Sequence, residues 1–385
     1  MPNVNIDELK NLISNGEIGA ITLDTSIFIY HHYGFEVGIL SKLSQFKNTD
    51  IKFIVVDMIQ YEILSHLIDE AKKDKAETKN VLKSIGNSWG VTPTIRQELM
   101  DTLFTNNEVE KSQIRFNDFK VATGALEIKC EDLSSIGKII ELYFNKTAPF
   151  STKSDKKNEF PDAFVLSALE VWAESNNTKI LAVSKDNDWK GFCSYSSFIY
   201  YIDELSQSLT AFHSNISVSI INSLRSIDIA ELNNDIMQFI PQQLDYITIN
   251  VDASSSFYYE PEYSEITIDN SEQTPINNID TFLSEIKIIE VEDSEFSVQL
   301  TINCEVDIET NVNFSTWDGI DKEYVSMGGG EFNRTESIDI DIIINFIKND
   351  DNDVEVNSIE VINSSVTIDL GDIEPDWLSS PDDYE

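Results

Sequence analysis

Four acidic residues, each at the edge of an apolar run, are the side chains of this sequence best suited to chemistry. Asp24 and Asp186 follow short apolar runs that are typical of buried strands. Glu62 and Asp162 lie at the start of stretches whose apolar residues recur at helical spacing. In an open parallel sheet, the carboxyl ends of the strands and the adjacent helix starts share one edge, where ligands bind. We therefore expect the four carboxylates to gather at that edge.

Carboxylates gathered at one edge repel one another unless a cation lies among them. A ligand set made only of oxygen suits Mg²⁺ or Mn²⁺, and two such ions can both lower the pKa of an attacking water and stabilise a leaving oxygen. The pattern is therefore typical of a metal-dependent phosphodiesterase. Within the set, Glu70 or Asp57 could serve in place of Glu62 if the helix that carries them were displaced.

Each of the four carboxylates also has a purely structural alternative. Asp24 and Asp186 could cap the N-termini of helices, a role that Asp fills readily. Asp162 follows a proline in a first helical turn, where the helix dipole favours negative charge. Glu62 could be a solvated residue of an amphipathic helix. Taken singly, these alternatives remain open.

The order of the predicted elements indicates an α/β fold over the first part of the chain. From residue 6 to 240, short β-like runs alternate with amphipathic helices, which implies a parallel sheet with helices on both faces. The predicted strands are 19–23, 50–56, 180–183 and 198–202. The predicted helices are 58–77, two or three between 78 and 145, 161–174, and a pair within 214–240.

From about residue 245 the apolar periodicity changes from 3.6 to 2. Six or seven segments alternate apolar and polar residues, separated by turn clusters such as Gly328–Gly330 and Asn349–Asp353. We predict an antiparallel β-domain over 245–375 with one wet, acidic face, and a tail over 376–385 that is either disordered or a docking segment.

Charge divides the chain in the same way. The net charge is −41, and residues 1–210 hold 22 Lys and Arg against 30 Asp and Glu, whereas the rest holds 5 against 38. So sharp a break suggests two parts with different partners, and a protein partner or self-association through the acidic domain is one such possibility. It also opposes binding of nucleic acid, because phosphate backbones are repelled by acidic proteins.

Composition further excludes several classes of protein. With 41% hydrophobic residues the chain is globular rather than disordered, and no apolar run approaches the ~20 residues of a membrane span. We expect no signal peptide, because the first residues lack a basic region followed by an apolar one. Three widely spaced cysteines argue against a disulfide framework and favour a reducing cytoplasm.

Four short motifs of the first part of the chain are Leu23–Ser26, Ala148–Ser151, Glu159–Ala163 and Val183–Asp188. Together they resemble the motifs of PIN domains, the nuclease fold of VapC-type toxins and, more distantly, of flap endonucleases. The resemblance covers residues 18–205 and is closest to a poorly characterised bacterial branch. It implies that Asp24, Glu62, Asp162 and Asp186 hold Mg²⁺ or Mn²⁺, with Asp188 as a further or indirect ligand.

The resemblance also suggests residues that contact substrate. Thr25 or Ser26 could hydrogen-bond a metal-bound phosphate, although a capping role is equally open. Clustered lysines near the metal edge would offer a local positive surface, or else form solvated loops; these are Lys153, Lys156, Lys157, Lys185 and Lys190.

We therefore expect a PIN-like nuclease domain over 1–240 that cleaves single-stranded RNA with the help of a divalent metal. A toxin-like or phage-defence role would suit such an enzyme. One alternative is a DNA or structure-specific nuclease, and another is a PIN scaffold used for protein–protein interaction. A haloacid-dehalogenase phosphatase would need Asp where Ser26 stands. A receiver domain would need a paired acid after its first strand, and the chain has no Gly-rich phosphate loop.

Overall fold

The chain forms two compact units, Met1–Asn215 and Ile216–Glu385. The computed structural model describes residues 6–150, 159–213, 217–244, 247–268, 273–292, 294–349, 354–362 and 365–379. The division falls earlier than the expected boundary near residue 240. The reason is that the helices of residues 217–239 bury their apolar faces with the strands that follow them, and not with the parallel sheet.

The first unit is built on a five-stranded sheet in the order β3-β2-β1-β4-β5. All of its strand pairs are parallel. The strands are β1 (Ile18–Leu23), β2 (Lys52–Val56), β3 (Leu126–Ile128), β4 (Lys179–Val183) and β5 (Ile199–Ile202). The predicted α/β class is confirmed. The short edge strand β3 was not predicted, because two of its three residues are exposed and give no apolar run.

The inner strands of this sheet are apolar almost throughout. Every residue of β2 after Lys52 is buried, and so is every residue of β4 after Lys179. Such continuous burial is typical of parallel strands that are covered on both faces. The helices of this unit are α1 (Ile6–Ser14), α2 (Thr25–Tyr30), the 3₁₀ helix η1 (Ser41–Phe46), α3 (Asp57–Ser88), α4 (Pro93–Leu103), α5 (Glu108–Thr123), α6 (Cys130–Leu133), α7 (Ile136–Asn145), α8 (Phe160–Ser175), α9 (Asn187–Cys193) and α10 (Leu205–Phe212).

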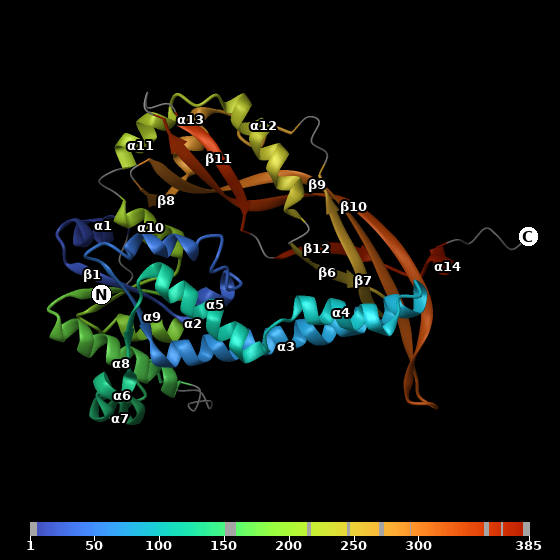
Figure 1. Cartoon of the computed structure of the whole chain (residues 1–385), viewed down its shortest axis with the longest axis horizontal. Helices are drawn as coiled ribbons and strands as arrows, with labels where there is room; N and C mark the ends of the chain where they lie inside the picture. Colours follow the sequence, from blue (N-terminus) through green and yellow to red (C-terminus); the bar gives the residue numbers. More distant parts are fainter. Residues whose placement is uncertain are drawn as a thin grey trace, which may run out of the picture. The chain divides into compact units, whose positions relative to one another are not determined.

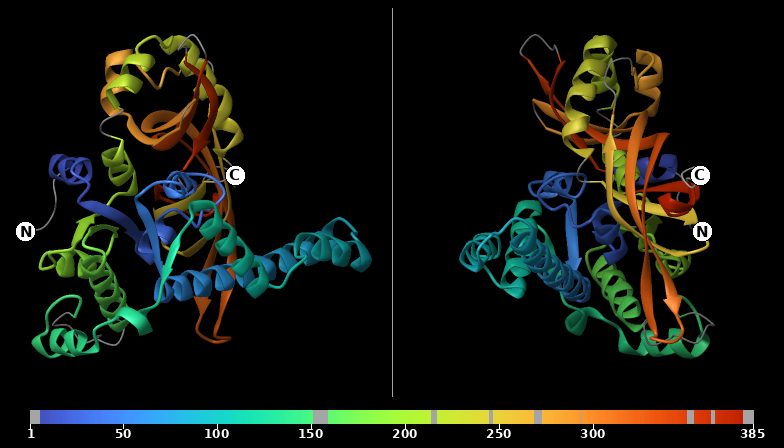
Figure 2. Two further views of the ribbon diagram at one scale, coloured as in Figure 1. Left: turned by 60° about the vertical axis from the view of Figure 1, so that its left-hand side comes forward. Right: turned by 90° about the vertical axis from the view of Figure 1, so that its right-hand side faces the viewer.

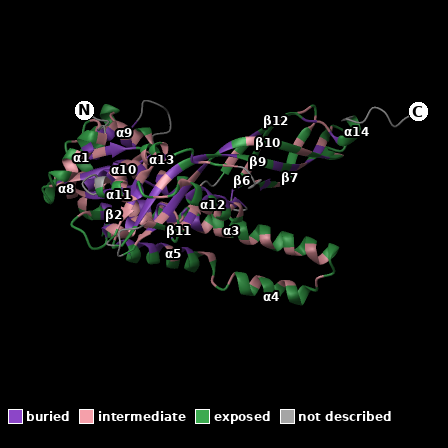
Figure 3. Ribbon diagram, turned by 90° about the horizontal axis from the view of Figure 1, so that it is seen from above, coloured by how far each residue is buried: buried purple, intermediate pink, exposed green. Residues whose placement is uncertain are grey.

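Helix α3 is much longer than the sequence predicted. It has 32 residues, of which only Ile59, Ile63 and Leu67 are buried, all near its start. Beyond these residues α3 continues with α4 alongside it, and the two form a projecting hairpin (Figures 1 and 2). No residue of α4 is buried, and the hairpin is exposed or half-buried along its length (Figure 3). The hairpin is therefore held together by contacts between its own two helices rather than by the core.

The second unit contains seven strands within the residues described. One sheet has the order β11-β10-β9-β7, with β8 also pairing β9, and all of its pairs are antiparallel. Strands β6 and β12 form a separate parallel pair. The strands are β6 (Thr248–Ser254), β7 (Tyr258–Thr267), β8 (Lys287–Val291), β9 (Glu295–Asp318), β10 (Glu323–Lys348), β11 (Val354–Val361) and β12 (Ser365–Asp372). The predicted antiparallel domain is confirmed.

Strands β9 and β10 form a long hairpin in which buried and exposed residues alternate, as the period of 2 predicted. The glycines Gly328–Gly330 were expected to form a turn, but they lie inside β10. The register of β9 and β10 shifts between Ser326 and Gly328, where Gly328 has φ +96°. A glycine with positive φ serves a bulge as well as a turn, and the sequence alone does not distinguish the two.

Short helices complete the second unit. They are α11 (Ser217–Leu224), α12 (Ile229–Phe239), the 3₁₀ helix η2 (Ile240–Gln242), α13 (Ile279–Glu285) and α14 (Asp376–Ser379). Ile220 and Ile236 join Phe296 and Ile344 in one apolar cluster. The predicted disordered tail begins with helix α14 instead, where the Trp377 indole donates a hydrogen bond to Met327 O at 2.7 Å. The rest of that tail lies outside the described residues. None of the helices described has the length and apolar character needed to cross a membrane.

Candidate active site

Two of the predicted acidic residues lie side by side at the carboxyl edge of the parallel sheet. Leu23 at the end of β1 is the register partner of Val183 at the end of β4. Asp24 follows the first strand directly, and its N–H donates to Val183 O at 2.9 Å. Asp186 follows the second strand at the start of α9. Parallel pairing therefore brings these two residues, distant in sequence, to one edge.

Asp24 is a buried carboxylate with 6% of its surface exposed. It occupies the N-cap position of α2 without a side-chain capping hydrogen bond. Its Oδ2 instead accepts hydrogen bonds from the hydroxyls of Ser26 and Ser184. Burial raises the pKa of Asp24, the two serines oppose that rise, and the charge of Asp186 adds to it.

Ser184 joins the two strand ends and was not among the predicted site residues. Its side chain is fully buried, its hydroxyl donates to Asp24 Oδ2 at 2.8 Å, and its Oγ accepts the Asp186 N–H at 2.9 Å. Ser26 makes a parallel link, because its Oγ accepts the Lys185 N–H at 3.0 Å. The signal in the sequence was a polar residue directly after the apolar run of β4, the same signal that identified Asp24.

Glu62 reaches the same edge from the start of α3. The Thr25 hydroxyl donates to Glu62 Oε2 at 2.6 Å. Of the two alternatives for this position, Asp57 accepts the N–H groups of Met58 and Cys130. Glu70 lies further along α3 and is exposed, and its charge contributes to the raised pKa values of Tyr33 and Arg115, which lie away from this edge. The helix thus presents Glu62, rather than either alternative, to the other carboxylates.

Asp162 is close enough to the other three carboxylates for each of them to affect its pKa. It lies half-buried in the first turn of α8, and its Oδ1 accepts the Trp189 indole N–H at 2.8 Å. Burial raises the pKa of Asp162 to about 7; the indole opposes that rise, and the nearby charges of Asp24, Asp186 and Glu62 add to it. The fully buried Trp189 was also missed by the sequence, because an aromatic residue in a helix is usually a core residue.

Asp186 and Asp188 lie together at the start of α9. Asp186 Oδ1 accepts the Asp188 N–H at 2.7 Å, so the capping role considered for Asp186 is realised. This capping hydrogen bond uses one carboxylate oxygen of Asp186, and the other oxygen takes no part in it. Burial raises the pKa of Asp188, with smaller contributions from the charges of Asp186 and Glu159.

Two of the predicted lysines lie on the same side of the unit as the carboxylates. Lys185 is exposed next to Asp186, with its Nζ 4.6 Å from the centre of the Tyr30 ring. Lys190 Nζ lies 5.9 Å from the centre of the Tyr201 ring. The predicted residues Lys153, Lys156 and Lys157 lie outside the described residues.

The donor set fits a hard divalent cation by its chemistry. It consists of carboxylate oxygens from β1, α3, α8 and α9, and each carboxylate has a second oxygen that the hydrogen bonds above do not use. Oxygen-only sets of this kind suit Mg²⁺ or Mn²⁺. As the side chains lie, no three His, Cys, Asp or Glu residues in the described part of the chain already close on a single point. Holding an ion therefore requires the carboxylates to turn towards one another.

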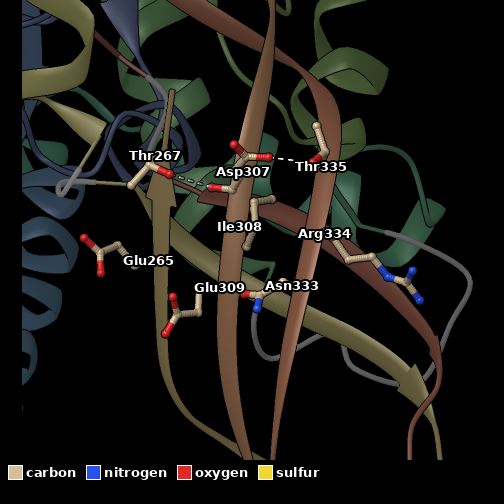
Figure 4. Close-up of a pocket in the computed structure, with 8 residues that line it drawn as sticks. All are labelled: Glu265, Thr267, Asp307, Ile308, Glu309, Asn333, Arg334 and Thr335. Carbon is tan, nitrogen blue, oxygen red and sulfur yellow. Dashed lines mark hydrogen bonds between the residues drawn. The ribbon is translucent and has the colours of Figure 1, made fainter. Parts of the chain in front are cut away.

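A different hollow, of about 370 Å³, lies on the sheet of the second unit (Figure 4). Glu265 and Glu309 face each other across β7 and β9 as register partners, an arrangement that is destabilising for like charges. Arg334 turns away from them and donates to Leu370 O at 3.0 Å. This hollow belongs to the acidic, solvated face that the sequence predicted, and nothing in it indicates a reaction.

Comparison with known protein families agrees with the geometry. A family model described as PIN domain matches residues 21–189, whereas a search of curated proteins found no match to the chain. The matched segment runs from β1 to α9 and includes Asp24, Glu62, Asp162, Asp186 and Asp188. This part of the chain is therefore a PIN domain, the domain of a family of nucleases.

Proposed function

We propose that the protein is a metal-dependent endonuclease that hydrolyses phosphodiester bonds of single-stranded RNA. The observation that carries the proposal is the convergence of Asp24, Glu62, Asp162 and Asp186 from four elements, with the pKa of Asp162 raised to about 7. Strongly shifted pKa values of this kind are concentrated at functional sites. Helix capping alone does not require four negatively charged side chains to lie close together, where they repel one another.

In this proposal the four carboxylates hold one or two divalent ions, and Asp188 supports them through Asp186. A bound Mg²⁺ or Mn²⁺ would supply an acidified water and neutralise charge on the phosphoryl group. Ser26, Ser184 and Trp189 position the carboxylates by hydrogen bonds. Thr25 positions Glu62 in the same way. We therefore assign Thr25 a positioning role in preference to the phosphate-binding role considered for it from the sequence.

Substrate class follows from the position of the site. The carboxylates lie buried or half-buried at the sheet edge, so the scissile backbone must bend towards them, which a single strand does more readily than a duplex. Exposed Lys185 beside Asp186 would attract phosphate locally against the acidity of the chain. RNA is the commoner substrate that the family resemblance implies, and a DNA or structure-specific nuclease is the alternative. The buried thiols of all three cysteines are free, which supports action in a reducing compartment such as the cytoplasm.

One assay tests the proposal. The purified chain is incubated with end-labelled single-stranded RNA, and separately with DNA of matched sequence, in Mg²⁺, Mn²⁺ or EDTA. We expect internal cuts in RNA with either metal and none in EDTA. Cleavage of DNA alone would favour the alternative nuclease. Intact RNA and DNA under all conditions would instead support a PIN scaffold that binds proteins.

A further inference from the structure

The α3–α4 hairpin carries a groove whose charge is opposite to that of the chain. The groove measures about 780 Å³ and its walls include five cationic side chains and no carboxylate. The cations are Lys72, Lys75, Lys79, Lys83 and Arg96. In a sequence with 27 Lys and Arg against 68 Asp and Glu, a groove of this composition is not expected from the average surface. It suggests an anionic occupant.

The lysines form one stripe along α3. Steps of three or four residues separate them, which places all four on one face of the helix. Lys72 and Lys75 already have carboxylate partners, Asp69 at 3.1 Å and Glu108 at 2.7 Å. Lys79 and Lys83 have no ion-pair partner among the residues that the structure describes. Their charges remain available to a ligand.

Arg96 shows that the groove is built rather than incidental. A Cβ placed on Gly86 would lie 2.7 Å from Arg96 Nη1 and 2.8 Å from its Cζ, so the guanidinium rests against the bare backbone of α3. Glycine inside a helix is less stable than alanine, so its presence here needs a reason such as this close approach. Arg96 Nε is buried without a hydrogen-bond acceptor, and no carboxylate of the described chain lies within ion-pair distance of its guanidinium. A cation is thus held in place with nothing anionic to bind.

An exposed aromatic residue stands at the tip of the same hairpin. Trp89 follows the last residue of α3 and has 84% of its surface exposed. Proteins that bind single-stranded nucleic acid combine a cationic groove for the backbone with aromatic side chains on which bases stack. The hairpin offers both features.

Helix α3 also sets the distance between the groove and the candidate active site. Glu62 and the four lysines lie on one continuous helix. At ~1.5 Å rise per residue, Lys72 to Lys83 lie roughly 15 to 32 Å from Glu62 along its axis. A strand cut near Glu62 can therefore reach the groove several nucleotides away from the cut.

We propose that the α3–α4 groove binds the phosphate backbone of the nucleic acid substrate at a distance from the scissile bond, with Trp89 stacking on a base. This inference rests on the proposed nuclease function. The occupant is a single strand, because phosphates contacted by Lys79, Lys83 and Arg96 leave unpaired bases free to reach the indole. An acidic protein segment is the competing occupant and would have no use for the exposed Trp89.

Binding is tested with the full chain carrying Asp162→Asn, so that the probe is not cut. The probe is a fluorescent single-stranded RNA of about 20 nucleotides, long enough at ~3.4 Å per stacked nucleotide to reach the groove. Replacing Lys79, Lys83 and Arg96 with Ala should weaken binding and lower the log–log salt slope by roughly 2, or ~0.7 per phosphate contact. Trp89→Ala should weaken binding roughly 5- to 150-fold. The matched control replaces three other lysines with Ala, namely Lys52, Lys73 and Lys129. None of them lines the groove, so the salt slope should be unchanged.

Cleavage in the wild-type background separates this inference from the nuclease proposal. The groove variant should lose rate on the long RNA at low concentration but cut a trinucleotide as the wild type does, because that probe spans only ~10 Å. If the control variant and the groove variant bind the long RNA equally well, the groove inference is wrong even where cleavage is intact. If no RNA or DNA is cut but the groove variant still loses binding, the nuclease proposal fails and the groove stands. Unchanged RNA binding together with lost binding of polyglutamate would overturn the inference in favour of an acidic protein partner.

Discussion

At Asp162, burial and three neighbouring charges act on one carboxyl group, and they raise its pKa to about 7. The substitution Asp162→Asn keeps the shape of the side chain and removes the charge that a cation requires. We expect RNA cleavage to fall by orders of magnitude. The melting temperature should hold or rise, because the crowded carboxylates lose one repulsion.

The control for this substitution is Glu174→Gln, which makes the same chemical change at an exposed position of the same helix. It should leave cleavage unchanged. A large loss of stability in Asp162→Asn, with a proportionate loss of activity, would instead support the helix-dipole role for Asp162. The two variants are compared by thermal melting and by initial cleavage rates at equal concentrations of folded protein.

The raised pKa of Asp162 also predicts how the stability of the folded chain depends on pH when no divalent cation is added. A carboxyl whose pKa is higher in the folded chain than in the unfolded chain binds more protons when folded, so its contribution to stability falls as pH rises. For Asp162 that fall lies between the ordinary value of ~3.9 and about 7. A divalent cation should reverse the trend, because it competes with the proton and favours the ionised form.

Melting curves from pH 5 to 8, with and without Mg²⁺ or Mn²⁺, check this expectation without relying on activity. The stabilisation by the cation should grow with pH and level off above about 7. Asp162→Asn should remove most of that pH dependence. A cation effect that is independent of pH and equal in both proteins would show that the ion binds elsewhere.

At the scale of elements, the loops after β1 and β4 depend on Ser184. Ser184→Ala leaves buried Asp24 with one donor fewer and frees the Asp186 N–H, at a cost of about 1–3 kcal/mol in the free energy of unfolding. We expect cleavage to fall further than stability explains, because two carboxylates lose their shared anchor. Cation-induced stabilisation should weaken with it.

Thr22→Val provides the matched comparison. The Thr22 hydroxyl is also buried in this sheet and donates to Ile54 O at 3.0 Å, away from the carboxylates. Its loss should lower stability by a similar amount and leave the response to the cation intact. An equal loss of cation response in both variants would mean that Ser184 acts only on stability. Denaturant unfolding and cation titration of the two proteins separate these outcomes.

The same elements show what the sequence could predict and where it could not. Long apolar runs and strand-end acids predicted β1, β2 and β4 and the residues at their ends, because continuous burial leaves a strong local signal. The partners of those acids, Ser184 and Trp189, were missed for another reason. Ser184 also follows the apolar run of β4 and Trp189 has the pattern of a core residue, but their hydrogen bonds to Asp24 and Asp162 arise only when distant segments meet. Helix α3 was predicted too short for the same reason, because its outer half is stabilised by α4 and not by an apolar face of its own.

At the scale of the whole molecule, charge is distributed very unevenly between the two units. The first unit holds 22 cationic and 30 acidic residues, and the second holds 5 and 38. The second unit has its own apolar core, so its charge is a fixed property of a folded part rather than of a loose segment. Any nucleic acid that approaches the chain experiences this negative field together with the cations of the α3–α4 groove.

Removing residues 216–385 tests whether that field restrains the nuclease. The cut follows the observed boundary between the units and leaves every element of the PIN domain in place. We expect the shortened chain to bind RNA more tightly and to cleave faster at low salt, because a net charge of −33 has been removed. The gain should shrink as salt rises from about 0.01 to 1 M, since the screening length falls from ~30 to ~3 Å over that range.

If the shortened chain is folded, as judged by cooperative melting, and binds RNA no better at low salt, the acidic unit does not act through its field. Its role would then be assembly or recruitment of a partner, and the full chain should self-associate or capture that partner where the shortened chain does not.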